Sequence, residues 1–231
     1  MSAPYQAQCI EIMAQTAQSR AMNTSWKTIL IAAIGAIQGA AAADVQERNL
    51  NVVVYDYAGL SDGSLNEMET LSAVLLSRAG IRTTWVHCLG HQSGPRPALC
   101  DANMETGTVL IRILAAHPAG NPNKLGDPLG SAIVANSFAT LYVSETRKYA
   151  DHTGLPASSL MAYAATHEIG HLLLGENHAP TGIMRAAWGK TEYREMAQRW
   201  LGFSAAEQQA LREALPTPGA LVASRKMNER P

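Results

Sequence analysis

Two histidines four residues apart, His167 and His171, narrow the structure of this chain further than any other pattern in it. In an α-helix that spacing puts both side chains on one face, one turn apart, so that both imidazoles can reach one metal ion. Glu168 follows the first histidine, and its carboxylate would point at a water on the ion without being a ligand. The pattern therefore predicts a helix that carries a metal site beside an acid–base group.

The surrounding residues predict the same helix independently. Apolar residues recur at helical spacing over 158–174, and Gly175 is suited to end the helix. A second interpretation stays open, in which the two histidines are partly exposed residues on the surface of an amphipathic helix. Two independent patterns, the apolar periodicity and the histidine spacing, thus predict the helix. The metal site is predicted from the histidine spacing alone.

A catalytic zinc ion generally takes three protein ligands and leaves its fourth position to water. His178 is the expected third ligand, because a turn at Gly175 would fold the chain back toward the ion. The alternative is a carboxylate from a later helix, Glu192 or Glu195.

His167-Glu168-x-x-His171, followed by Gly175-x-x-His178 and Met184, resembles the motif of the metzincin zinc endopeptidases. The resemblance implies one zinc ion held by the three histidines, with Glu168 as general base. It also implies a Met-turn in which Met184 forms a hydrophobic floor beneath the metal. Both Gly175 and His178 stand one residue later than in the family motif, and we expect a wider turn, with Asn177 in the left-handed region, to absorb the shift.

The function implied by this resemblance is a zinc metallopeptidase that cleaves peptide or protein substrates. Glu168 would take a proton from a zinc-bound water and return it to the leaving amine. Substrate would bind as an extended strand along an edge of the sheet, for which segment 131–136 is the expected edge. One alternative is a non-proteolytic zinc-binding protein, although a structural site has no use for Glu168; another is a peptidase that acts on a single partner.

The beginning of the chain has the layout of an export signal. Lys27 precedes about a dozen apolar residues, and small residues ending in Ala41-Ala42-Ala43 follow as a cleavage site. We therefore expect a signal peptide at 22–43, a dispensable extension at 1–21, and a single catalytic domain at 44–231 that is secreted or periplasmic. The alternative is a buried or membrane-surface helix at 28–43.

Cysteine usage agrees with export. Cys88 and Cys100 flank a loop rich in Gly and Pro that a disulfide could close, while Cys9 lies in the segment expected to be removed. Two free, buried thiols in a reducing compartment are the alternative. A zinc site built from these cysteines is disfavoured, because neither belongs to a C-x-x-C pair.

The hydrophobic pattern predicts a mixed α/β (α+β) fold. Strands are expected at 49–59, 81–87 and 108–115, with a short strand pair at 131–136 and 139–144. A helix over 65–79, capped by Asp62 or Ser64, would link the first two strands as a parallel crossover. With a long loop at 117–130 and a C-terminal helix at 204–215, we expect a twisted mixed sheet of about five strands, and the resemblance to the metzincins implies that its helices have a zincin-like arrangement.

Composition excludes some partners. The formal net charge is −1, with 18 basic against 19 acidic residues, so the chain has no basic surplus for nucleic acid. Hydrophobic residues make up 47% of the chain, which is too many for a disordered protein. We expect a monomer without a stable membrane span once the signal is removed.

Overall fold

The computed structural model describes residues 47–89, 95–101, 106–121 and 124–216. The expected extension at 1–21 and signal peptide at 22–43 lie outside the described residues. Within those residues, none of the helices combines the length and the apolar character that a membrane crossing requires.

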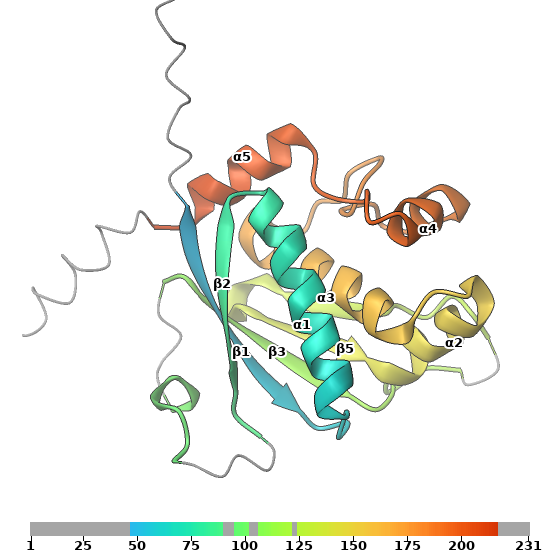
Figure 1. Ribbon diagram of the computed structural model, residues 1–231, viewed down its shortest axis with the longest axis horizontal. Coiled ribbons are helices and arrows are strands. Elements are labelled where there is room, and N and C mark those ends of the chain that lie inside the picture. The colour runs from blue at the N-terminus through green and yellow to red at the C-terminus, as the bar shows by residue number, and fades with distance from the viewer. Residues whose placement is uncertain (1–46, 90–94, 102–105, 122–123, 217–231) are drawn as a thin grey trace, which may run out of the picture. The chain divides into compact units, whose positions relative to one another are not determined.

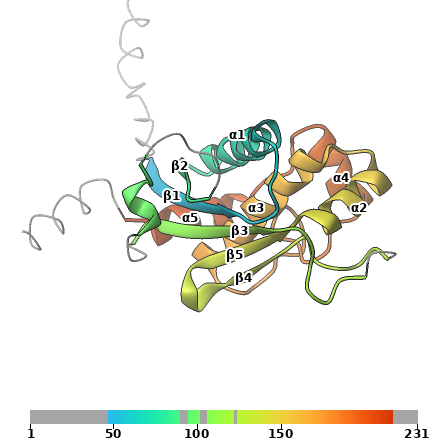
Figure 2. The same cartoon turned by 90° about the horizontal axis from the view of Figure 1, so that it is seen from below.

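Five strands form one mixed sheet (Figures 1 and 2). Its order is β2-β1-β3-β5-β4, and every neighbouring pair is parallel except β4 and β5. The strands are β1 (Arg48–Asp56), β2 (Ile81–His87), β3 (Thr108–Leu114), β4 (Gly130–Ile133) and β5 (Phe138–Tyr142). The prediction of a mixed sheet of about five strands is confirmed, and β4 is an edge strand.

The first crossover follows from the local sequence. Helix α1 (Asp62–Arg78) joins the parallel strands β1 and β2. Its N-cap is Ser61, whose hydroxyl accepts from the Ser64 amide, so the predicted cap at Asp62 or Ser64 was wrong. After the helix Gly80 takes a φ of 80°, a conformation that favours glycine, and the chain enters β2.

Helix α3 (Ala157–Leu174), expected at 158–174, runs through the middle of the protein. It lies beside α1 over one face of the sheet (Figures 1 and 2). Every residue from Leu160 to His171 is buried, so α3 has no solvent-facing side over these three turns. The alternative of two histidines on the surface of an amphipathic helix is therefore wrong.

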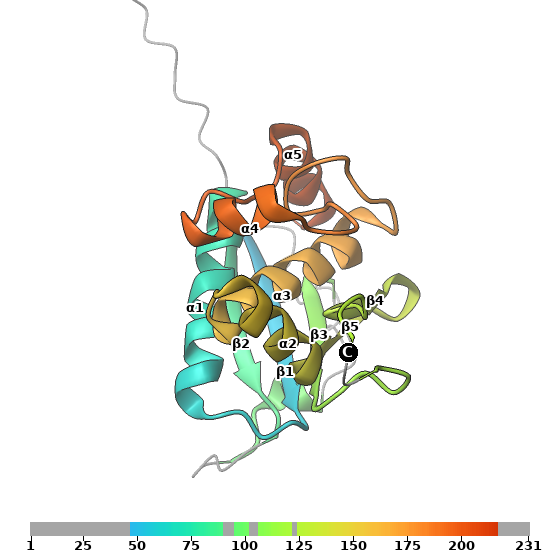
Figure 3. The same ribbon diagram turned by 90° about the vertical axis from the view of Figure 1, so that its right-hand side faces the viewer.

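Two helices were not predicted. Helix α2 (Val143–Thr153) starts directly after β5 without a side-chain cap, and its sequence is mainly polar. Val143 and Ser144 therefore belong to this helix rather than to the predicted strand 139–144. Helix α4 (Lys190–Ala197) has only two buried residues, and it lies with α5 (Ala205–Ala214) above α3 (Figure 3).

The predicted strand at 131–136 is shorter than expected, because residues 134–136 form a 3₁₀ turn that leads through Ser137 in the left-handed region.

The C-terminal helix was predicted closely, at 204–215 against the observed α5 (Ala205–Ala214). The Ser204 hydroxyl accepts from the Glu207 amide, and the Glu207 carboxylate accepts from the Ser204 amide, as in a capping box.

Cys88 and Cys100 form a disulfide with their Cα atoms 5.4 Å apart, which confirms the predicted pairing. Both cysteines are buried in a small cluster with Val53. Because side chains alternate along β1, Val53 faces away from the main core that contains Val52 and Val54. Cys88 and Cys100 thus cover part of the sheet face opposite α1 and α3.

Candidate metal centre

The central helix presents three polar side chains from within the core. His167, Glu168 and His171 are each less than 10% exposed. Burial of three such groups on an otherwise apolar helix is costly unless they have partners or ligands. Their position therefore indicates a functional site.

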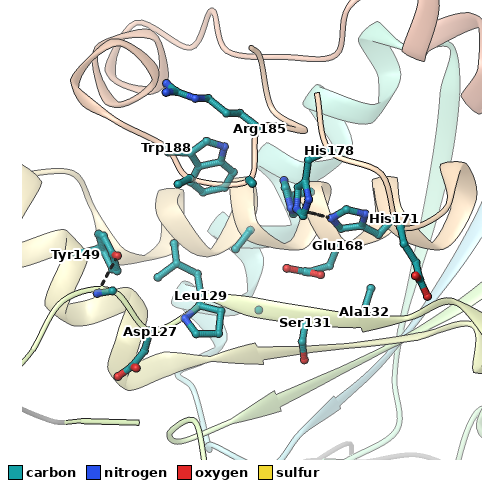
Figure 4. A pocket seen from close by; sticks show the side chains of 18 of the residues that line it. Asp127, Leu129, Ser131, Ala132, Tyr149, Glu168, His171, His178, Arg185 and Trp188 are labelled. Carbon is teal, nitrogen blue, oxygen red and sulfur yellow. Dashed lines mark hydrogen bonds between the residues drawn. The ribbon is translucent and has the colours of Figure 1, made fainter. Parts of the chain in front are cut away.

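Gly175 makes the turn that leads from α3 to the third histidine, His178. It ends α3 with a φ of 94°, and its amide still donates to the His171 carbonyl at 2.9 Å. The following residues then bring His178 back over the helix end (Figure 4). The expectation that Asn177 adopts a left-handed conformation was wrong, because among the described residues only Ser137 and Arg199 are non-glycine residues with positive φ. The glycine alone makes the turn.

The three imidazoles converge through their Nε2 atoms. His171 Nε2 lies 3.0 Å from His167 Nε2 and 3.1 Å from His178 Nε2. One ligand atom from each of the three residues lies within 4.8 Å of the others. The structure thus gathers the three histidines that the sequence analysis selected.

Backbone carbonyls orient two of these rings. His167 Nδ1 lies 2.7 Å from the Ile183 oxygen, and His171 Nδ1 lies 2.9 Å from the Gly175 oxygen. A neutral imidazole that donates from Nδ1 carries a lone pair on Nε2, which is the atom that coordinates metals. Burial lowers the pKa of His167 to about 4, which favours that neutral form.

The resulting arrangement fits a cation. Unprotonated Nε2 atoms about 3 Å apart repel each other through their lone pairs, and a divalent cation between them would turn this repulsion into attraction. Three imidazoles suit zinc better than calcium or magnesium, which prefer oxygen ligands. The donor set therefore fits a zinc ion.

Glu168 lies beside the three nitrogens and faces the cleft (Figure 4). Burial raises the pKa of its carboxyl group to about 8. The start of β4 packs directly against it: a Cβ atom on Gly130 would lie 2.8 Å from both Cγ and Oε1 of Glu168. Gly130 therefore leaves the space that this carboxylate occupies, a role that the sequence analysis missed.

Met184 lies under the helix that carries the first two histidines. It is 1% exposed, and a Cβ atom on Gly170 would overlap its sulfur. The preceding Ile183 supplies the carbonyl that orients His167. Gly170, which stands inside the His-Glu-x-x-His pattern, was also missed; its lack of a side chain is the only sequence signal for this close contact.

The alternative carboxylate ligands lie elsewhere. Both Glu192 oxygens accept from Arg185 Nη1, at 2.7 and 2.8 Å, and Glu192 Oε2 also accepts from the Gly189 amide. Glu192 and Glu195 line a separate hollow near Trp200. The structure therefore brings His178, and neither glutamate, to His167 and His171.

An open cleft of about 490 Å³ gives access to the site. Strand β4 and the loop before it form one wall, and the segment after Met184 forms the other (Figure 4). Tyr149 from the unpredicted α2 and Trp188 line the end of the cleft that lies toward Asp127 (Figure 4), and the ring centroid of Tyr193 from α4 lies 6.4 Å from that of Tyr149. The Trp188 ring also stands edge-on to His167, with the ring centroids 5.6 Å apart.

No model of a known protein family matches the sequence, and a search of curated proteins finds no significant match. Solved structures with a similar fold include an archaemetzincin from Methanopyrus kandleri (14% identity, TM-score 0.46). The alignment covers 96% of that protein and 73% of this chain. Another is a zinc-dependent peptidase from Methanocorpusculum labreanum (12% identity, TM-score 0.47), and this alignment covers 99% of that protein and 69% of this chain.

Metalloproteinase-II from Bacteroides fragilis (13% identity, TM-score 0.45) aligns with 74% of this chain, which spans about half (54%) of that protein's length. Identities of 12–14% and TM-scores of 0.45–0.47 do not show that these proteins and this chain share a function.

Proposed function

We propose that the protein is a zinc-dependent endopeptidase. The observation that carries this proposal is the convergence of three imidazole Nε2 atoms beside a buried carboxylate in an open cleft. His167, His171 and His178 would hold one zinc ion. A zinc ion with three protein ligands keeps a position for water and lowers the pKa of that water toward neutrality.

Glu168 would act as the acid–base group. Its carboxylate would accept a proton from the attacking water at Oε1 or Oε2 and then donate that proton to the leaving amine. The raised pKa suits a group that must both take up and release a proton near neutral pH. A cation bound nearby would lower this pKa again by favouring the charged carboxylate.

The edge strand supplies a place for the peptide. Within the described part of the chain, β4 pairs only with β5, so its outer edge has backbone groups that an extended peptide can pair with. Ile133 at its end is 47% exposed. We infer that substrate lies along β4, which brings its backbone past Gly130 and Glu168.

Metal analysis and cleavage assays on residues 44–231 test the proposal. We expect about one zinc per chain and cleavage of a panel of denatured proteins that a chelator abolishes. Glu168→Gln keeps the size of the side chain but removes the base, so it should retain zinc and lose at least about 100-fold in kcat. Zinc binding without cleavage by the unaltered protein would favour the non-proteolytic alternative.

Export is part of the proposal. The apolar segment before Ala43 and the Cys88–Cys100 disulfide both suit a protein that crosses into an oxidising compartment. Intact-mass measurement on protein recovered outside the cytoplasm should show a chain that begins at Asp44; a chain that begins earlier would contradict cleavage there.

A further inference from the structure

One ammonium group outside the metal centre is surrounded by oxygen atoms. Lys148 Nζ on α2 lies 2.8 Å from the Asn121 carbonyl and 3.1 Å from the Lys124 carbonyl. It also lies 3.4 Å from one oxygen each of Asp127 and Glu145. An ammonium group has three donors and a full charge, so this one centre draws together two backbone segments and two carboxylates.

The two carboxylates tie the same loop in additional ways. Asp127 accepts from the Asn121 amide at 2.7 Å, and Glu145 accepts from the His117 amide at 3.3 Å and from the Ser144 hydroxyl. Burial alone would raise the pKa of Glu145, but these hydrogen bonds and the charge of Lys148 lower it overall. The hydrogen bond from the Asn121 amide and the contact with Lys148 likewise lower the pKa of Asp127. Both carboxylates are therefore charged at neutral pH, and the single charge of Lys148 offsets part of their negative charge.

The loop held in this way forms a wall of the cleft. Gly126, Asp127, Pro128 and Leu129 all line it, and we call residues 126–129 the loop wall. Tyr149, the neighbour of Lys148 on α2, accepts from the Gly126 amide at 3.1 Å and lines the same end of the cleft (Figure 4). Two consecutive residues of α2 thus bind the loop, one by charge and one by a hydroxyl.

We infer that Lys148 is a positioning residue for substrate recognition: its ammonium group holds the loop wall against α2 and so shapes the end of the cleft between Asp127 and Trp188. This inference rests on the proposed peptidase function. The rings of Tyr149 and Trp188 and the side chain of Leu129 give that end an apolar surface beside Asp127, on which an apolar side chain of the peptide would pack. Lys148 itself does not touch the reacting atoms.

The experiment compares Lys148→Met, which keeps side-chain length without charge, with Lys148→Arg, which keeps the charge. Arg147→Met is the matched control, because Arg147 is exposed on the same helix. In the absence of substrate, we expect the backbone amides of the loop wall to exchange at least about tenfold faster in Lys148→Met than in the unaltered protein. The reason is that the substitution removes the charge-assisted hydrogen bonds of Lys148. Lys148→Arg should restore part of the protection, and the control should not change it.

The kinetic arm separates positioning from general damage. For peptides with a large apolar residue, we expect KM to rise about tenfold in Lys148→Met while kcat and zinc content stay within about twofold. Unchanged loop exchange, or an equal loss of kcat and zinc, would overturn the inference. Should Lys148→Met fail to fold, Asp127→Asn removes one of the two carboxylates and should produce the same KM rise in weaker form; no rise would also overturn it. Failure of the proposed function is visible separately, as absence of cleavage by the unaltered protein.

Discussion

At the scale of single residues, the site depends as much on absent side chains as on present ones. Gly170 leaves room for Met184 under the helix, and Gly130 leaves room for Glu168 beside the edge strand. The second contact is directly testable, because Gly130 does not have a positive φ and its backbone can accept alanine.

Gly130→Ala should reduce catalysis without removing zinc. The added methyl group would lie 2.8 Å from the Glu168 carboxylate and 3.0 Å from the Thr140 carbonyl, so the carboxylate must move. Displacing a catalytic group by about 1 Å can cost about 100-fold in rate, and we expect a kcat loss of about 10- to 100-fold with unchanged zinc content. Gly63→Ala is the control, since nothing lies within 4 Å of its Cβ position; equal kinetics for both variants would show that Glu168 does not depend on this contact.

At the scale of elements, side-chain contacts join helices to strands away from the cleft. Glu69 on α1 lies 2.9 Å from His87 Nε2 at the end of β2. The hydrogen bond to Glu69 raises the pKa of His87 above its usual value of 6.5, and the negative charges of Glu69, Asp56 and Asp62 raise it further, although burial opposes them. A neutral imidazole can still donate from Nε2 to Glu69, but the ion pair between α1 and the sheet forms only while His87 is protonated.

Stability should consequently depend on pH through His87. Because its pKa is higher in the folded state than in the unfolded state, the contribution is complete below about pH 6.5 and is lost as pH rises through the folded pKa. Urea unfolding of chelated protein should show His87→Gln less stable by up to about 1 kcal/mol at pH 5.5, with a smaller difference at pH 8.5. A difference that stays constant over this range would mean that the charge of His87 contributes nothing.

At the scale of the whole molecule, a metal ion would connect parts of the chain that the sheet does not hold. His167 and His171 come from the central helix and His178 from the segment beyond it, so one ion would fasten that segment to the core. Binding to the folded state alone stabilises a protein by about 2.7 kcal/mol when the ligand is at 100 times its Kd.

Zinc removal should therefore lower the thermal midpoint. For a domain of this size, 2.7 kcal/mol corresponds to about 5–10 °C. We expect calorimetry to show this difference between zinc-loaded and chelated protein, and to show most of it missing in His178→Ala. If His178→Ala responds to zinc like the unaltered protein, His178 is not a ligand.

The sequence by itself determined the elements whose signals are local. The spacing of His167 and His171, the β-branched run of β1 and the capping box at Ser204 each depend on residues close together in the chain, so helix α3, the strands and α5 could be predicted. The Cys88–Cys100 pair could be predicted because the intervening loop is short and the pair is even. Helix α2 was missed because it follows β5 directly without a side-chain cap, and α4 because it is only eight residues long and begins after a glycine.

Only the tertiary structure decided how these elements meet. The approach of Gly130 to Glu168, of Gly170 to Met184 and of Lys148 to the loop wall joins residues that are distant in sequence or buried against other elements. The sequence favoured His178 but left Glu192 open as an alternative, and only the structure shows that Arg185 binds the Glu192 carboxylate. Such contacts depend on packing in three dimensions, and neither hydrophobic periodicity nor motif spacing encodes distances between separate elements.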